Sequence, residues 1–166
     1  MGKFYRRLMR IEGQVSQFVP EAINEHDELI PERVIKMVKG DEIWIEVSLE
    51  KQMLYLYEGT TITSAYRVST GKPGSSTRKS MATRKGVYRM YKLYKTYPMS
   101  GREGDGYWWC PDVPYVMFFH GELAIHGAYW HNDFGKPISH GCVNMMPNDA
   151  GDLYHWCKVG TVVWVH

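Results

Sequence analysis

The sequence has little that would place the protein within a membrane or on nucleic acid. Its 166 residues contain no apolar run near the length of a transmembrane helix, and the longest ones are short stretches such as TVVWV. The formal net charge is only +2, and no RNA-binding or helix-turn-helix signature accompanies it, so we expect no nucleic-acid partner. MGKFYRRLMRIEG carries basic residues but no apolar segment after them, so it is not a secretory signal as written.

Cysteine is scarce as well. An odd number of cysteines cannot form a complete disulfide framework, and no CxxC pair indicates a zinc or thioredoxin-like site. A bond between Cys110 and Cys157 is one alternative, but separate burial of the two thiols explains both without it. At least one thiol therefore remains for chemistry or for burial; the three residues are Cys110, Cys142 and Cys157.

What the sequence does contain is typical of a soluble globular protein. Hydrophobic residues make up 44% and charged residues 23%, and the length allows one domain with a real core and an appendage. Aromatic residues are frequent, with 12 Tyr and 6 Trp. Their usual role is core and cross-strand packing, and a binding cleft is the second interpretation.

Two regions differ in hydrophobic period. Residues 1–40 include FYRRLMRIEGQVSQFV, which has helical spacing, and then prolines that interrupt it at Pro20 and Pro31. We predict an N-terminal helical or linking segment over 1–40 and one domain over 41–166.

From Ile43 the period becomes two, which is typical of β-strands. A helix is predicted at 147–158, where acidic residues stand in the first turn and glycine closes the end. The fold class is therefore mainly β, a sandwich or partly closed barrel with one main helix. The predicted elements are a strand at 43–49, a hairpin turning at Glu58–Gly59, one strand at 86–94, a long loop or flap at 96–114, a short hairpin around His120–Gly121 and a terminal strand at 161–166.

Five of the seven histidines lie between residues 120 and 155, the region that also holds Cys142. Thiol catalysis needs a base for the thiol proton and backbone N–H groups that face the oxyanion. His126 could take the proton if the intervening loop folds back. Gly141 would let the chain bend so that its N–H and that of Cys142 face a substrate carbonyl. A buried, inert Cys142 is the alternative.

The same residues could hold zinc, with His126, His140 and Cys142 as ligands and His120 or His131 as the fourth. However, the spacing in HGC is not a usual chelate spacing, and no acidic residue stands beside it as a general base. We therefore expect neither a metal nor another cofactor.

These residues carry a family resemblance. AIHGAYWHNDFGKPISHGCVNMMPNDA resembles the active-site signature of the L,D-transpeptidases, the YkuD family, in which a His and a spacer precede [Ser/Thr]-His-Gly-Cys-x-Asn. IEVSLEKQMLYLYEG and YRVSTGKPGSSTRKSMATRKGVYRM are similar to the family's earlier strands, so the resemblance covers about 43–166. It implies an L,D-transpeptidase type of β-sandwich with a flap over the active site.

The resemblance also implies roles for individual residues. Cys142 would be the nucleophile and His126 the general base, with the Gly127 carbonyl orienting the imidazole. The Gly141 and Cys142 amides would bind the oxyanion. The remaining expected cleft and substrate-binding residues are Ser139, His140, Asn144, Trp130, and Tyr107 or, as second choice, Tyr115 from the flap.

Two departures from the family pattern concern loops. Only 12 residues separate His126 from Ser139, so the loop over the site is expected to be small. The run SSTRKSMATRKG is longer and more basic than the family's usual form, which leaves the shape of that loop open.

The implied activity is peptidoglycan 3→3 cross-linking through a cysteine thioester, with release of D-Ala from a tetrapeptide stem and transfer to a diamino-acid acceptor. The alternatives are an L,D-carboxypeptidase, an enzyme that anchors proteins to peptidoglycan, and a non-catalytic binding module. Carbapenem-type β-lactams would inhibit the enzyme, and a monomer is expected. Because the polymer lies outside the cytoplasm, the chain is expected to be extracytoplasmic and cell-wall associated, truncated or mature, with 1–40 as a spacer.

Overall fold

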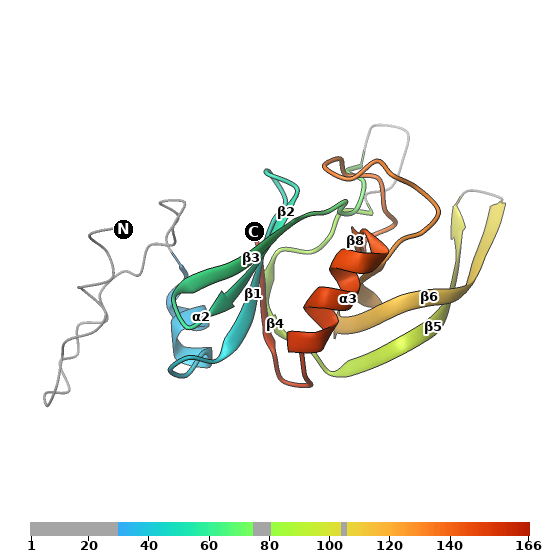
Figure 1. Cartoon of the computed structure of the whole chain (residues 1–166). Helices are drawn as coiled ribbons and strands as arrows, with labels where there is room; N and C mark the ends of the chain where they lie inside the picture. The colour runs from blue at the N-terminus through green and yellow to red at the C-terminus, as the bar shows by residue number, and fades with distance from the viewer. Residues whose placement is uncertain (1–29, 75–80, 104–105) are drawn as a thin grey trace, which may run out of the picture.

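The computed structural model describes residues 30–74, 81–103 and 106–166, which form two β-sheets packed against each other with one main helix beside them (Figure 1). One sheet has five strands in the order β3-β2-β1-β9-β4, and the other has four in the order β5-β6-β7-β8. The predicted mainly β sandwich is confirmed, and the two sheets do not close into a barrel. In chain order the elements are α2 (Glu32–Met37), β1 (Ile43–Ser48), β2 (Met53–Glu58), β3 (Thr61–Arg67), β4 (Gly86–Arg89), β5 (Lys92–Glu103), β6 (Gly106–His120), β7 (Leu123–Gly127), β8 (Val143–Met145), α3 (Pro147–Trp156) and β9 (Val162–Val165).

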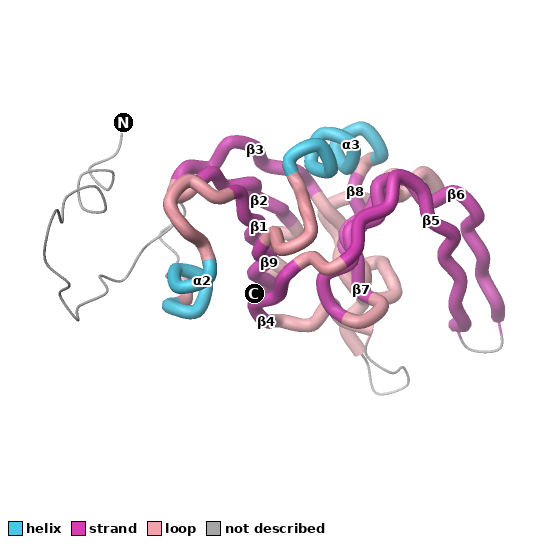
Figure 2. The backbone as a smooth tube through the Cα atoms, turned by 90° about the horizontal axis from the view of Figure 1, so that it is seen from below, coloured by secondary structure: helices cyan, strands magenta, loops and turns pink. Residues whose placement is uncertain are grey.

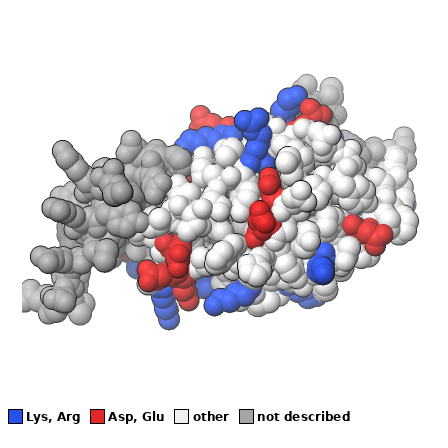
Figure 3. Space-filling view, in the orientation of Figure 1, with Lys and Arg blue, Asp and Glu red and all other residues white. Residues whose placement is uncertain are grey.

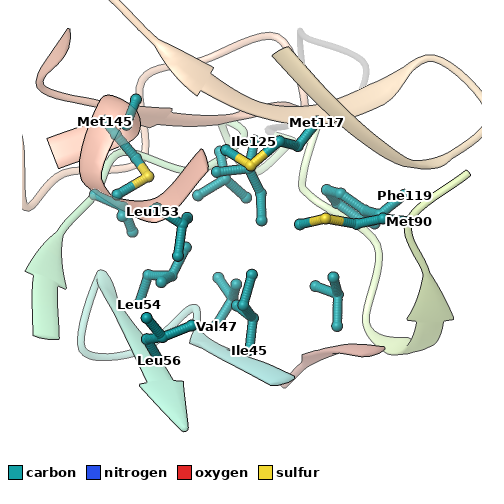
Figure 4. Close-up of a cluster of buried hydrophobic side chains, with 14 of the residues drawn as sticks. Ile45, Val47, Leu54, Leu56, Met90, Met117, Phe119, Ile125, Met145 and Leu153 are labelled. Carbon is teal, nitrogen blue, oxygen red and sulfur yellow. The ribbon is translucent and has the colours of Figure 1, made fainter. Parts of the chain in front are cut away.

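The main core lies between the two sheets (Figure 4). Ile45 and Val47 of β1 point into it from the five-stranded sheet, as their period of two predicts. Met117 and Ile125 enter from β6 and β7 on the opposite side. Leu153 of α3 is fully buried in the same core, and the helix packs against β6 and β7.

A second core covers the outer face of the five-stranded sheet. Trp44 of β1 stacks on Tyr57 with ring centroids 4.1 Å apart, and Val34 of α2 packs over the same cluster. Glu46 is fully buried, where its carboxylate accepts a hydrogen bond from the Tyr57 hydroxyl at 2.6 Å and lies 3.0 Å from His166 Nε2. Both faces of β1 are thus buried.

Helix α2 belongs to the predicted N-terminal segment of 1–40. The helical spacing expected in FYRRLMRIEGQVSQFV falls on residues 4–19, outside the described residues, and the domain boundary at 40/41 stays a prediction. In the described part of the chain, no helix is long and apolar enough to cross a membrane. Basic and acidic side chains are interspersed on the face in Figure 3, in keeping with the small net charge.

The prediction of one strand over 86–94 is wrong. The segment contains β4 in one sheet and the start of β5 in the other. Met90, between them, is 1% exposed and packs in the main core. Core-facing residues follow at Tyr88, Met90 and Leu93, a break of one residue that is too small for hydrophobic period to reveal that the chain changes sheets.

The segment 96–114 is not a loop but most of a long antiparallel hairpin, formed by β5 and β6, that projects from the sandwich (Figures 1 and 2). The segment 96–114 lies where the flap is predicted, but the loop structure predicted for it is wrong. Pro98 and Pro111 lie where the register shifts between Tyr97 and Met99, a place where a ladder tolerates residues without an N–H. We call this hairpin the arm.

Candidate active site

The parallel pairing of β7 with β8 brings the two principal candidate residues together. His126 lies opposite Asn144 in this pairing, and Cys142 comes two residues before Asn144. Opposite residues of paired strands share a face. The His126 and Asn144 side chains therefore project to the same side, and Cys142, in the loop just before β8, lines the same pocket as both.

The loop that carries Cys142 is held by Ser139. Its backbone N–H donates to the Thr70 carbonyl at 3.0 Å, and its carbonyl accepts from the Lys72 N–H at 3.0 Å. Its hydroxyl donates to the Cys142 carbonyl at 2.5 Å and accepts from the Gly141 N–H at 3.1 Å. The predicted oxyanion donor Gly141 N–H is therefore bonded within the loop, which leaves Cys142 N–H as the remaining predicted donor.

Gly141 has a φ of +130°, a backbone conformation that residues other than glycine rarely adopt. A Cβ atom at this position would also lie 2.9 Å from Leu123 Cδ2. Glycine thus allows the chain to turn sharply just before Cys142.

Thr83, which belongs to the run SSTRKSMATRKG but is not among the predicted site residues, supports this loop. It is 3% exposed, and its Oγ1 accepts a hydrogen bond from the Gly71 N–H at 2.9 Å and donates one to the Gly141 carbonyl at 2.7 Å. The Thr83 hydroxyl therefore links Gly71 to Gly141, the residue before Cys142.

Thr83→Val should destabilise the loop, because the isosteric side chain leaves both a buried N–H and a buried carbonyl without their partner. We expect the free energy of unfolding in urea to fall by about 1–3 kcal/mol, and thioester formation at Cys142 to slow. Thr83→Ser, which keeps the hydroxyl, is the matched control. A Thr83→Val protein with wild-type stability and acylation rate would contradict this role.

The pocket beside Cys142 has a volume of about 480 Å³. Its floor comes from β7, β8 and the loop before β8, and its roof comes from the arm. The residues that line it are Met99, Trp108, Cys110, His126, Trp130, His131, Ile138, Ser139, His140, Cys142 and Asn144.

His126 is 2% exposed, and its Nδ1 lies 3.0 Å from the Gly127 carbonyl oxygen. In the neutral ring this contact places the proton on Nδ1, because the carbonyl only accepts, and it leaves a lone pair on Nε2. Burial lowers the pKa of His126 to about 4; the hydrogen bond to Gly127 opposes this shift and nearby His131 adds to it. The imidazole is thus a neutral proton acceptor across the physiological pH range.

The Cys142 thiol is partly exposed and donates a weak hydrogen bond to the Glu122 carbonyl at 3.7 Å. Burial raises its pKa to about 11; a hydrogen bond with the Ala124 backbone lowers the pKa and the Glu122 charge raises it further. Together with the pKa of His126, this gives a resting site of neutral thiol and neutral imidazole.

This resting state predicts how the reactivity of Cys142 depends on pH. The rate of alkylation by iodoacetamide, followed at the Cys142 peptide, should rise about tenfold per pH unit between about pH 7 and 10, because only the thiolate reacts and its fraction grows with pH. Glutathione under the same conditions is the reference thiol and should level off earlier. A plateau already reached near pH 7 would instead indicate a preformed thiolate–imidazolium pair.

The other predicted site residues fall into two groups. His140 and Trp130 line the pocket; His140 stacks on Trp108 at 5.2 Å, and Trp130 lies 5.7 Å from the His126 ring. Tyr107 and Tyr115 do not line it. Tyr107 is 66% exposed.

Tyr115 turns away from the pocket toward helix α3. Its φ is +55°, and its ring lies 5.5 Å from that of Tyr154 and against Gly151 of the helix. The expectation that one of the two tyrosines completes the oxyanion site therefore finds no support in the structure.

The three cysteines are free thiols, so the alternative of a Cys110–Cys157 bond is not observed. Cys110 lines the pocket, whereas Cys157 packs beside the main core. Among the residues that the structure describes, no group of three His, Cys, Asp or Glu side chains could hold a metal ion.

The sequence interpretation did not select five of the lining residues. Trp108 and Cys110 alternate along β6, a signal that was present but that the loop interpretation of 96–114 concealed. From the sequence, His131 is a candidate only as a zinc ligand. In the structure its Nε2 lies 3.1 Å from the Asn144 amide nitrogen. The five are Met99, Trp108, Cys110, His131 and Ile138.

A family model described as the L,D-transpeptidase catalytic domain, YkuD, matches residues 42–165. No curated protein matches the sequence. The catalytic domain of the Enterococcus faecium L,D-transpeptidase has a similar structure, with 26% identity, a TM-score of 0.63, and coverage of 76% of this chain and 98% of that one.

Two further structures share the fold. An L,D-transpeptidase from Mycobacterium smegmatis is 19% identical with a TM-score of 0.67, and it matches over 75% of this chain and 58% of its own. L,D-transpeptidase 3 from Mycobacterium tuberculosis, in complex with a faropenem-derived adduct, is 17% identical with a TM-score of 0.65, over 75% and 60%. The chain thus spans less than two thirds of the length of these two proteins.

Proposed function

Because the chain belongs to the family of L,D-transpeptidase catalytic domains, we propose that it is an enzyme that forms 3→3 cross-links in peptidoglycan through a thioester on Cys142. The observation that carries the proposal is the neutral His126, whose Nδ1 is held by the Gly127 carbonyl, in the same pocket as the Cys142 thiol. A base with a free Nε2 lone pair and a thiol in one pocket are the two groups that acyl transfer through sulfur requires.

In the first half-reaction, His126 Nε2 takes the thiol proton as Sγ attacks the carbonyl carbon of the bond between the third residue of the donor stem and D-Ala. The Cys142 N–H stabilises the oxyanion that forms. The carbon–nitrogen bond then breaks, His126 returns the proton to the leaving amine, and D-Ala departs. Because both groups rest neutral, the proton moves during the attack and not before it.

In the second half-reaction, the side-chain amine of an acceptor stem attacks the thioester carbonyl. His126 accepts the proton that the amine loses, the carbon–sulfur bond breaks, and the sulfur recovers the proton as a thiol. Atoms and charges balance without a cofactor.

The same thioester could pass to water or to a protein amine, which would make the enzyme a carboxypeptidase or a protein-anchoring enzyme. Incubation with tetrapeptide-stem muropeptides, followed by chromatography and mass spectrometry, separates these outcomes. We expect free D-Ala and a 3→3 dimer. Tripeptide stems without a dimer would indicate hydrolysis, and the absence of both D-Ala and any product would leave only a non-catalytic binding module.

Carbapenem-type β-lactams should acylate Cys142, because their strained carbonyl can take the place of the donor carbonyl. One solved structure similar to this chain is an L,D-transpeptidase in complex with imipenem. Since peptidoglycan lies outside the cytoplasm, we also propose an extracytoplasmic location at the cell wall. Recovery of the native protein only in the cytoplasmic fraction of its cells would contradict that location.

A further inference from the structure

The two faces of the arm differ in what they contact. Trp108 and Cys110 of β6 line the pocket, and they pair with Gly101 and Met99 of β5 respectively. Trp109, between them, projects to the other side of the strand and is 60% exposed. One face of the arm therefore roofs the pocket, and the other faces solvent.

The Trp108 ring is held between the arm and the loop that carries Cys142. On the arm, a Cβ atom at Gly101 would lie 2.6 Å from the indole, so the ring packs directly on the glycine backbone. On the loop, the ring stacks on His140 with centroids 5.2 Å apart and planes inclined by 18°. His140 is two residues from Cys142, so this stack joins the roof of the pocket to its floor.

The indole N–H of Trp108 is buried and finds no hydrogen-bond acceptor among the residues that the structure describes. A buried donor without an acceptor carries an uncompensated desolvation cost, and such groups are rare in native proteins. Trp108 lines the pocket. Because its N–H is buried in the free protein, a small turn of the ring on His140 is needed before an acceptor on a ligand in the pocket can reach it.

The chemistry of the pocket indicates what kind of acceptor this is. Its described lining contains no Lys, Arg, Asp or Glu side chain, and His126 is held neutral. A carboxylate would lose its hydration there without gaining a cation, whereas a peptide carbonyl is a neutral acceptor that the indole N–H can satisfy.

We propose that Trp108 is a substrate-binding residue of the arm: its indole N–H donates a hydrogen bond to a backbone carbonyl of the donor stem peptide, and its ring, stacked on His140, covers that peptide beside Cys142. The proposal rests on the function proposed above and assigns one contact of the same site. In the free enzyme the Trp108 indole N–H has no acceptor among the described residues, and the bound stem supplies one.

Trp108→Phe removes the N–H and keeps an aromatic ring that can stack on His140. Because the contact is made with bound substrate, we expect kcat/KM for the donor stem to fall about tenfold, with most of the change in KM and little in kcat. Trp109→Phe is the matched control, since it makes the same change on the solvent face of the same strand, and its kinetics should equal those of the wild type. Equal kinetics for the two variants would overturn the proposal.

A direct measurement uses the Cys142→Ala protein with ¹⁵N-labelled tryptophan, which binds the donor stem without turnover. The indole resonance absent from the spectrum of the Trp108→Phe variant identifies Trp108. On titration with the tetrapeptide stem this resonance should move downfield, as a newly formed hydrogen bond requires, while that of Trp109 stays in place. An unchanged Trp108 resonance at saturating peptide would overturn the proposal.

The two proposals fail separately. If a thioester forms on Cys142 but the Trp108 resonance does not move, the substrate contact is wrong and the proposed function stands. If the resonance moves but no thioester forms in the wild-type protein, the proposed chemistry is wrong and the pocket still binds the stem through Trp108.

Discussion

Cys142→Ala should lower the rate of D-Ala release and dimer formation by about 10⁴-fold or more, which is the scale of loss when a catalytic nucleophile is removed. Cys110 also lines the pocket, but it lies on the arm and not beside the Cys142 N–H, the predicted oxyanion donor, so it should not take over the attack. Cys142 is partly exposed at the edge of the pocket, so removing one sulfur atom should leave the fold intact. Product chromatography measures the rate, and circular dichroism with thermal unfolding checks the fold.

Cys157→Ala is the matched control. It removes one sulfur from a thiol that packs beside the main core and does not line the pocket, so it should keep wild-type activity at a modest cost in stability. Residual turnover of Cys142→Ala at a tenth of the wild-type rate or above would show that the acyl group is not carried by this cysteine.

His126→Gln is expected to reduce kcat/KM by about 10²- to 10⁴-fold, the usual contribution of a general acid–base residue. Glutamine is neutral, like the buried imidazole, and has a similar size, so the pocket should keep its shape. Its amide cannot accept and return a proton, and without a base the thiol, with a pKa of about 11, is almost fully protonated at neutral pH. The rate of thioester formation measures the effect.

His155→Gln provides the control for this change, because His155 lies on the exposed side of α3 and should tolerate the substitution without loss of rate. The slowed His126→Gln enzyme should regain part of its rate as pH rises toward the pKa of the thiol. A variant with wild-type kinetics at neutral pH would remove His126 from the mechanism.

The periodicity of the sequence was sufficient for the elements whose pattern is not interrupted. β1, the hairpin of β2 and β3, and helix α3 lie where the pattern predicted them. Hydrophobic period reports which side a residue faces and not which sheet it belongs to, so it could not separate β4 from β5 at Met90.

The prediction of a loop over 96–114 rests on the glycines and prolines of that segment, and the prolines mislead. Pro98 and Pro111 are usually taken to exclude a strand, but both lie at a shift in register, and β5 is an edge strand of its sheet. The prediction of a loop over 96–114 hides the alternation that turns Trp108 inward and Trp109 outward.

The candidate site was predictable where it follows a local motif and not where it depends on distant segments. SHGCVN and AIHG identified Cys142 and His126, but only the parallel pairing of β7 with β8 explains why residues 16 apart in sequence share one pocket. Thr83 contributes to the site through one hydroxyl, which bonds Gly71 and Gly141. A contact of this kind leaves no pattern in a sequence.

The central claim is that Cys142 becomes acylated by the donor stem. Intact-protein mass spectrometry of the wild-type enzyme, incubated with a tetrapeptide donor in the absence of an acceptor, tests it most directly. We expect a mass increase equal to the stem without its terminal D-Ala. It should lie on the peptide that contains Cys142, be removed by hydroxylamine as a thioester is, and be absent from Cys142→Ala. An unmodified wild-type protein, or an adduct on any other residue, would contradict it.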